Sequence, residues 1–224
     1  MHPSQQDFSL SQTICISPLC YHPNKSMPYT QTAFSQAIFK MFDNLDFWLA
    51  KNYADLPNNA LTVYIFGGCA LHLHTGVRTS NDVDAELKSI PQLKPIHTLE
   101  KVIQSVDFDD EQGFPRSLDW DGAFQPSIAP IDPLYEDRAT LIHTTQSGLI
   151  FIYLVSAVDI AVSKLGRLES VDRDDIQALY REGLFSKQEF LDTAEEAYKY
   201  SSVAMDKLKF NIDLASDLLD EETR

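Results

Sequence analysis

The chain has 224 residues, of which 44% are hydrophobic and 23% charged, a balance typical of a globular protein with a real core. Its 33 acidic and 18 basic side chains give a formal charge of −15, which argues against broad, sequence-independent binding to nucleic acid and favours basic partners. No apolar run reaches membrane-spanning length, no secretory signal is recognisable, and the three cysteines lack zinc-type spacing. We therefore expect a cytoplasmic protein with reduced thiols and no membrane contact.

The predicted elements begin with an extended or disordered arm over residues 1–32, which carries four prolines and only two charged side chains. Apolar residues three and four positions apart predict an amphipathic helix over 32–53. The rest of this first part is a strand over 60–66, a turn at Gly67 and Gly68, a short helix ended by Gly76, and a strand over 82–87.

The second part is predicted to contain fewer strands and more helices. A helix around 98–106 and a strand or hairpin within 117–128 precede a strand over 148–155. Four helices follow. The first is headed by Ser156, with Asp159 completing a capping-box-like start, and runs through residue 169. The second is capped by Asp172 and closed by Gly183, the third starts with a Ser186 and Glu189 capping box and runs to Tyr200, and the last covers about 201–219.

This order predicts an α+β fold, with a small mixed β-sheet flanked by helices and a helical segment at the C-terminus. We expect an α/β core over residues 33–155 and a helical region over 156–224 packed on it.

Two aspartates alternate on the strand over 82–87. Positions i and i+2 of a strand face the same side, so Asp82 and Asp84 lie side by side and repel each other unless a cation neutralises them. A pair of Mg²⁺ ions, or Mn²⁺, would satisfy both acids and orient a phosphoryl transfer. The alternative is a solvent-facing strand on which alternate acids have no catalytic duty.

The two glycines narrow these alternatives. A strand that ends at Gly67 and Gly68 and opens a short helix leaves backbone N–H groups free at the helix start, where phosphate oxygens bind well. Tight turns use glycines everywhere, but the sequence of strand, Gly-Gly, short helix and Asp-Val-Asp is a narrower pattern.

This pattern resembles the nucleotidyltransferase superfamily with the DNA-polymerase-β-like fold, and Gly67, Gly68, Asp82 and Asp84 match its signature position by position. The segment "VSAVDIAVSKLGRLESVDRDDIQALYREGLFS" (155–186) also looks like the tail of minimal bacterial nucleotidyltransferases of the AbiEii-like toxin type. The resemblance covers roughly residues 60–190. It implies a nucleotidyltransferase core in which Asp82 and Asp84 hold the metal and Lys164 reaches the triphosphate.

Two features depart from the family pattern. The family usually has Ser or Thr after the glycines to bind phosphate, whereas this chain has Cys69, whose thiol is a weaker hydrogen-bond donor. The family often carries a third carboxylate on a later strand. Asp119, Asp121 and Asp132 are the candidates, and an alternating strand suits Asp119 or Asp121 best.

Several other polar residues have both a functional and a structural interpretation. Helical periodicity places Lys164 on the solvent side of its helix, where it is a phosphate ligand or an ordinary surface lysine. Arg78 and Ser80 precede the Asp82 strand and suit a triphosphate, but a turn has the same composition. Of Asp174 and Asp175, one is expected to complement the helix dipole and the other to be an active-site acid.

Two histidines stand between the glycines and the aspartates. His72 and His74 are two apart in a short helix and point in different directions, so packing or capping is expected of them rather than metal binding.

The expected activity is transfer of a nucleoside monophosphate from a nucleoside triphosphate (NTP) to an acceptor hydroxyl, with release of pyrophosphate. The resemblance suggests an RNA end such as a tRNA 3′ terminus, or a protein, as acceptor, and an antitoxin protein as partner. The charge of −15 makes RNA less suitable and favours a protein or small-molecule acceptor. The alternatives are a catalytically weak nucleotide-binding or partner-binding member of the same fold, and a plain interaction scaffold.

Overall fold

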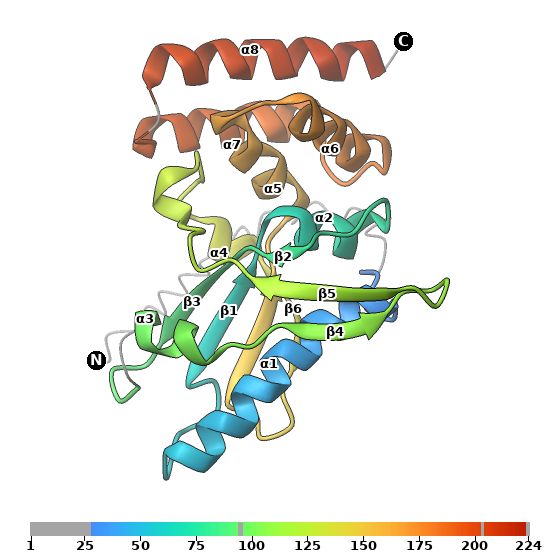
Figure 1. Cartoon of the computed structure of the whole chain (residues 1–224). Helices are drawn as coiled ribbons and strands as arrows, with labels where there is room; N and C mark the ends of the chain where they lie inside the picture. Colours follow the sequence, from blue (N-terminus) through green and yellow to red (C-terminus); the bar gives the residue numbers. More distant parts are fainter. Residues whose placement is uncertain (1–27, 94–95, 203, 223–224) are drawn as a thin grey trace, which may run out of the picture.

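The computed structural model describes residues 28–93, 96–202 and 204–222, and their strands form two small sheets with helices on either side (Figure 1). This arrangement confirms the predicted α+β class. Most of the arm predicted over residues 1–32 lies outside the described residues; its last part, Pro28 to Thr32, leads into the first helix. No described helix is both long and apolar enough to cross a lipid bilayer.

The four-stranded sheet has the order β3-β1-β7-β6. At its centre β1 (Leu61–Ile65) runs antiparallel to β3 (Ala85–Ser89) and parallel to β7 (Ile150–Leu154), and β6 (Thr140–Thr144) pairs antiparallel with β7. The two central strands alternate fully buried aliphatic residues on the core face, which is why "LTVYI" and "IFIYL" form strands. Both strands were predicted, whereas β6 was not.

The three-stranded sheet has the order β2-β5-β4. Here β2 (Asp82–Val83) runs parallel to β5 (Pro115–Trp120), which pairs antiparallel with β4 (Val106–Asp109). The prediction of one continuous strand over 82–87 is wrong. The chain leaves the small sheet after Val83 and joins the large sheet at Ala85, so Asp84 stands at the junction.

The segment between β3 and β4 also differs from expectation. A helix was predicted around 98–106, but α3 (Ile96–Leu99) and the 3-10 turn η1 (Glu100–Val102) end before β4 begins at Val106. The valines and isoleucine of this stretch suited either structure, and pairing with β5 decides in favour of the strand.

The long helix α1 (Ala33–Asn52) lies along both sheets. Thr32 is its N-cap residue, and the Thr32 side chain accepts a hydrogen bond from the Ser35 N–H, as threonine often does at this position. Its rings contact three strands: Phe34 meets Phe108 of β4, Phe42 meets Trp120 of β5, and Phe39 stacks on His143 of β6. This shared helix holds the two sheets in a fixed relation.

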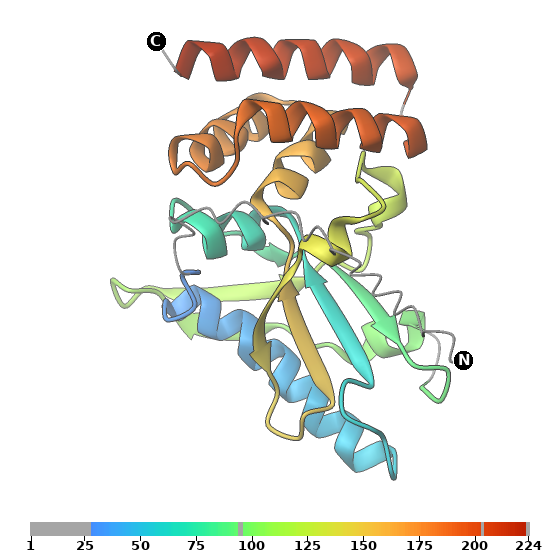
Figure 2. The ribbon, with the colours of Figure 1, turned by 180° about the vertical axis from the view of Figure 1, so that it is seen from behind.

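The remaining helices form a layer on the side of α2 (Gly67–Thr75), seen above the sheets in Figure 2. Helices α5 (Ala157–Ser163) and α6 (Ser170–Arg181) contact α2, and α7 (Lys187–Tyr200) and α8 (Met205–Glu222) cover them. The 3-10 turn η3 (Lys164–Gly166) joins α5 to α6. Two short pieces, η2 (Pro126–Ile128) and α4 (Tyr135–Arg138), connect β5 to β6.

Of the three N-terminal caps predicted for α5, α6 and α7, the structure confirms two. Ser156 caps α5 and the Ser186 and Glu189 capping box opens α7, as predicted. Asp172 does not cap α6. That helix begins three residues earlier, and Asp172 accepts a hydrogen bond of 3.0 Å from the N–H of Glu169.

A buried carboxylate joins α1 to the turn between β6 and β7. Asp46 accepts hydrogen bonds from Thr145 Oγ1 (2.7 Å), Ser147 Oγ (2.5 Å) and Ser147 N–H (3.1 Å). We expect Asp46→Ala to lower the free energy of unfolding by about 1–3 kcal/mol, because it removes a buried carboxylate that accepts three hydrogen bonds. Urea unfolding checks this, with Asn44→Ala on the exposed face of α1 as control. Equal stability of the two variants would contradict it.

Candidate functional site

The end of β1 and the junction residue Asp84 are held together. The N–H of Phe66 donates to the carbonyl of Asp84 over 2.8 Å, and the chain then turns at Gly67 with a φ of +58°. A Cβ atom at Gly67 would lie 1.7 Å from Asp84 Oδ2. Only glycine permits both this backbone conformation and the close approach of the carboxylate to the turn.

Three carboxylates gather at this point. The N–H of Asp121 donates to the carbonyl of Val83 (3.2 Å), which extends the β2–β5 pairing to the level of Asp84. Burial raises the pKa of Asp84 to about 6, helped by the negative charges of Asp82 and Asp121 and by a hydrogen bond to the Asp121 side chain. Asp82, Asp84 and Asp121 therefore form one acidic cluster.

The other two candidates for a third carboxylate are engaged elsewhere. Asp119 is exposed and accepts a hydrogen bond of 2.5 Å from Ser105 Oγ, and Asp132 is buried in an ion pair with Arg138 at 2.8 Å. By position, Asp121 is the acid that joins Asp82 and Asp84.

The acidic cluster suits a divalent cation that arrives with a substrate. Among the described residues, no three His, Cys, Asp or Glu side chains make a preformed metal cage. Mg²⁺ is commonly held by one or two carboxylates together with substrate phosphates, so a preformed cage is not required. Burial and the nearby carboxylates Asp82 and Asp121 raise the pKa of Asp84, and a bound cation would favour its ionised form. Asp82 and Asp84 are the oxygen ligands that fit.

The start of α2 faces the same region with unpaired backbone groups. Its N-cap, Phe66, makes no side-chain cap hydrogen bond, and the first N–H groups of a helix have no partner inside it. A Cβ atom at Gly68 would lie 2.9 Å from Ser80 Oγ and 3.2 Å from Arg78 Nη1. Gly68 thus lets the loop before β2 lie against the helix start, where Ser80 Oγ donates to Asp82 Oδ1 over 2.7 Å.

Cys69 lies behind this helix start. Its side chain is fully buried, its thiol donates to the carbonyl of Asp82 over 3.2 Å, and burial raises its pKa well above the ordinary value. The thiol therefore supports the Asp82 backbone, and what Cys69 offers a ligand is its backbone N–H.

Two cations meet on a buried carboxylate beside the cluster. Arg78 donates from Nε (2.9 Å) and Nη2 (2.6 Å) to Asp175, and Lys164 Nζ donates to Asp175 Oδ2 over 2.6 Å. The positive charge of Lys164 also opposes the rise in the pKa of Asp84, so the cations and the acids act on one another. The Arg78 side chain is 36% exposed and faces the solvent side of the site.

The prediction that Lys164 lies on the solvent side of its helix is wrong. The α-helix ends at Ser163, and Lys164 begins the η3 turn with a side chain only 9% exposed. Asp175, the acid that the sequence left undecided, is buried against it, whereas Asp174 is exposed. Neither acid lies in the first turn of α6, since that helix begins at Ser170.

A second carboxylate extends this ionic network. Asp172 binds Arg167 through both guanidinium Nε (2.8 Å) and Nη2 (2.9 Å) and lies 3.8 Å from Lys164 Nζ. Burial raises the pKa of Asp172, but Arg167, the Glu169 N–H and Lys164 outweigh burial and lower it overall. Asp172 is therefore ionised at neutral pH.

The two histidines have structural partners, as expected. His72 bonds Thr32 Oγ1 (2.9 Å) and the Arg78 carbonyl (3.0 Å), and burial lowers its pKa, so it is a neutral packing residue. His74 Nε2 bonds the carbonyl of Val155 over 2.8 Å. Through His72, α2 fixes the backbone of Arg78.

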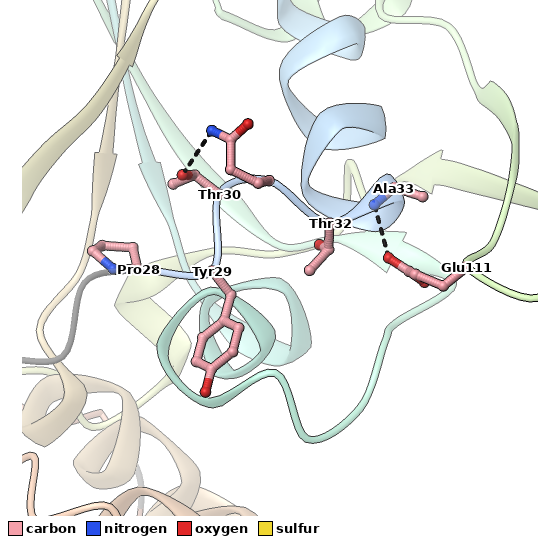
Figure 3. A pocket seen from close by; sticks show the side chains of 7 residues that line it. Pro28, Tyr29, Thr30, Thr32, Ala33 and Glu111 are labelled. Carbon is pink, nitrogen blue, oxygen red and sulfur yellow. Dashed lines mark hydrogen bonds between the residues drawn. The ribbon is translucent and has the colours of Figure 1, made fainter.

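A shallow pocket lies at the start of α1, outside the acidic cluster and the ionic network of Arg78, Lys164 and Asp175. Residues 28–33 line it together with Glu111, whose Oε1 accepts a hydrogen bond of 2.8 Å from the N–H of Ala33 (Figure 3). None of the proposed site residues lines this pocket, so it is not part of the site.

Comparison with known proteins identifies the chain at family level. A family model described as nucleotidyltransferase of unknown function (DUF6036) matches residues 47–206, which include the glycines, the three carboxylates and the Arg78, Lys164 and Asp175 network. A search of curated proteins finds no match. Since the family model covers more than half of the chain, the protein belongs to this family of nucleotidyltransferases.

Proposed function

We propose that the protein transfers a nucleoside monophosphate from an NTP to an acceptor hydroxyl in a reaction that requires Mg²⁺ or Mn²⁺. The observation that carries the proposal is the convergence of Asp82, Asp84 and Asp121 beside the unpaired N–H groups at the start of α2. Acids that hold a metal lie there next to backbone donors that suit phosphate. Family membership supports the same chemistry.

Each group has one task in this proposal. The acceptor oxygen forms a bond to the α-phosphorus, the bond from that phosphorus to the bridging oxygen breaks, and pyrophosphate leaves. Asp82 and Asp84 would hold a metal ion, which would supply Lewis-acid stabilisation of the phosphoryl charge. The N–H groups of Gly68 and Cys69 bind phosphate oxygens, and Asp121 accepts the proton of the acceptor hydroxyl. Ser80 orients Asp82 through the hydrogen bond from its hydroxyl.

The cations serve the leaving group. Arg78 and Lys164 lie together on Asp175, and Lys164 acts electrostatically on Asp84. These cations are held in place before the reaction. They can therefore offset the negative charge that develops on pyrophosphate without any rearrangement of the protein during the reaction.

The charge of the chain bears on which class of acceptor the protein uses. A formal charge of −15 disfavours a long phosphate backbone, so we propose a protein or small-molecule hydroxyl ahead of an RNA end such as tRNA. A toxin role with an antitoxin partner remains a proposal that rests on the resemblance of residues 155–186. A cytoplasmic location is a proposal that rests on the cysteine pattern and on the lack of a recognisable secretory signal.

A nucleotide-binding member without transfer activity is the second candidate. The observation that favours it is that Arg78 and Lys164 are both already bonded to Asp175. Incubation with each α-labelled NTP, Mg²⁺ and a cell lysate separates the two candidates, because only transfer labels an acceptor.

We expect Asp82→Asn and Asp84→Asn each to reduce transfer by at least about 100-fold, since each removes a metal ligand and metal stabilisation is worth several kcal/mol. Transfer of label to the acceptor checks this. Asp119→Asn is the matched control, because Asp119 is on the neighbouring strand but is bonded to Ser105. Loss of activity in the control alone, or unchanged activity in Asp84→Asn, would contradict the assignment.

The raised pKa of Asp84 predicts a pH-dependent difference in stability. The folded pKa is about 6 against an ordinary value of 3.8, so folding favours the protonated acid, and the stability that protonation contributes is lost as pH rises through about 6. Without divalent metal, Asp84→Asn should exceed the unaltered protein in Tm, by a larger margin at pH 7.5 than at pH 5, because the loss is complete only above the folded pKa. Thermal unfolding in EDTA checks this, and an Asn variant that is less stable at pH 7.5 would contradict it.

A further inference from the structure

The C-terminal helix carries one polar residue in an otherwise apolar buried stripe. Leu208, Ala215 and Leu219 are fully buried on one face of α8, and Asn211 lies among them with 6% of its surface exposed. A buried amide in such a stripe costs free energy unless its hydrogen bonds are made, so its partner shows why it is there.

That partner is the turn that carries Lys164. Asn211 Nδ2 donates to the carbonyl of Leu165 over 2.6 Å, within η3. The Leu165 side chain is itself fully buried. The turn is therefore held both by the packing of this side chain and by the hydrogen bond from Asn211 to the Leu165 carbonyl. The two residues are 46 positions apart, and the contact forms only when α8 is docked.

The backbone of this turn determines where the Lys164 ammonium lies. The α-helical path ends at Ser163, and the tighter η3 turn directs the Lys164 side chain inward to Asp175. An uninterrupted α-helix would instead place Lys164 on the solvent face, which is where the sequence periodicity put it. The hydrogen bond from Asn211 thus contributes to the inward position of the cation.

The other end of α8 is fastened independently. Glu222 binds Arg181 at 2.6 Å, and Asp220 binds Lys187 at 2.6 Å. The family model ends at residue 206, so nearly all of α8 lies beyond the matched part of the chain. Family membership therefore does not assign a role to this helix.

We infer that Asn211 is a positioning residue for nucleotide binding, and that α8 acts on the site by holding Lys164 where it meets the leaving pyrophosphate. This rests on the proposed function, since it assumes that Lys164 binds phosphate. Asn211 itself touches no substrate. Its effect passes through the Leu165 carbonyl and the η3 turn.

A double-mutant cycle tests the inference on the full chain, with magnesium pyrophosphate as the probe and isothermal titration calorimetry as the readout. We expect Asn211→Ala to weaken binding about fivefold to tenfold, the size of one lost hydrogen bond. In a Lys164→Ala background the same change should weaken binding by less than about twofold, because the residue through which Asn211 acts is gone.

Two further variants control for folding. Asn211→Gln keeps an amide donor and should retain more affinity than Asn211→Ala, whereas Asn211→Leu fills the space without a donor and should match Asn211→Ala. Circular dichroism shows which variants fold, and Asn211→Leu replaces Asn211→Ala in the cycle if the alanine variant does not. Glu222→Gln loosens the far end of α8 and should bind as the unaltered chain does.

The outcomes separate this inference from the proposed function. If the unaltered chain binds pyrophosphate and Asn211→Ala binds it equally well, or loses as much affinity in the Lys164→Ala background, the inference is overturned and the proposed function stands. If the unaltered chain binds neither pyrophosphate nor any NTP, both fail together.

Discussion

One backbone hydrogen bond, from the Phe66 N–H to the Asp84 carbonyl, fixes the geometry on which the candidate site depends. It joins the end of β1 to the residue at which the chain leaves the small sheet and enters the large one. The Gly67 turn then lies directly against the Asp84 carboxylate, and α2 starts beside it. This link brings the Asp84 carboxylate to the start of α2, while α1 holds the two sheets in their relation.

The charges around the site fall into two groups. In the acidic cluster, burial and the neighbouring carboxylates Asp82 and Asp121 together raise the pKa of Asp84. Beside it, the three cations Arg78, Lys164 and Arg167 share the two buried carboxylates Asp172 and Asp175. A metal-bound nucleotide supplies cation to the first group and phosphate to the second, so it suits a site divided in this way.

The sequence predicted the parts of the site that local signals encode. Gly67, Gly68, Asp82 and Asp84 were recognisable because glycine turns and strand alternation depend on neighbours a few residues apart. The same holds for α1, β1, β7 and α7, whose apolar periods or caps are strong. Family membership agrees with that prediction at the level of the superfamily.

The parts that sequence missed depend on distant partners. The break at Asp84 arises because β2 pairs with β5 and β3 with β1, and no local pattern shows which partner a strand chooses. Lys164 was placed on a solvent face because helical periodicity was extended past Ser163, where contacts with Asp175 and Asn211 favour a tighter turn. The bond between Arg78 and Asp175 spans 97 positions and had no signal beyond the charges themselves.

That long separation also bears on how the protein is made. Chains emerge from the ribosome N-terminus first, and contacts between distant residues form late because the intervening loop must be closed. The glycine turn and Asp84 lie in the first half of the chain, whereas Asp175 and Asn211 follow much later. During translation, Gly67, Asp82 and Asp84 therefore leave the ribosome before Asp175 and Asn211 are made. The ionic network beside the acids can form only after the C-terminal helices have been synthesised.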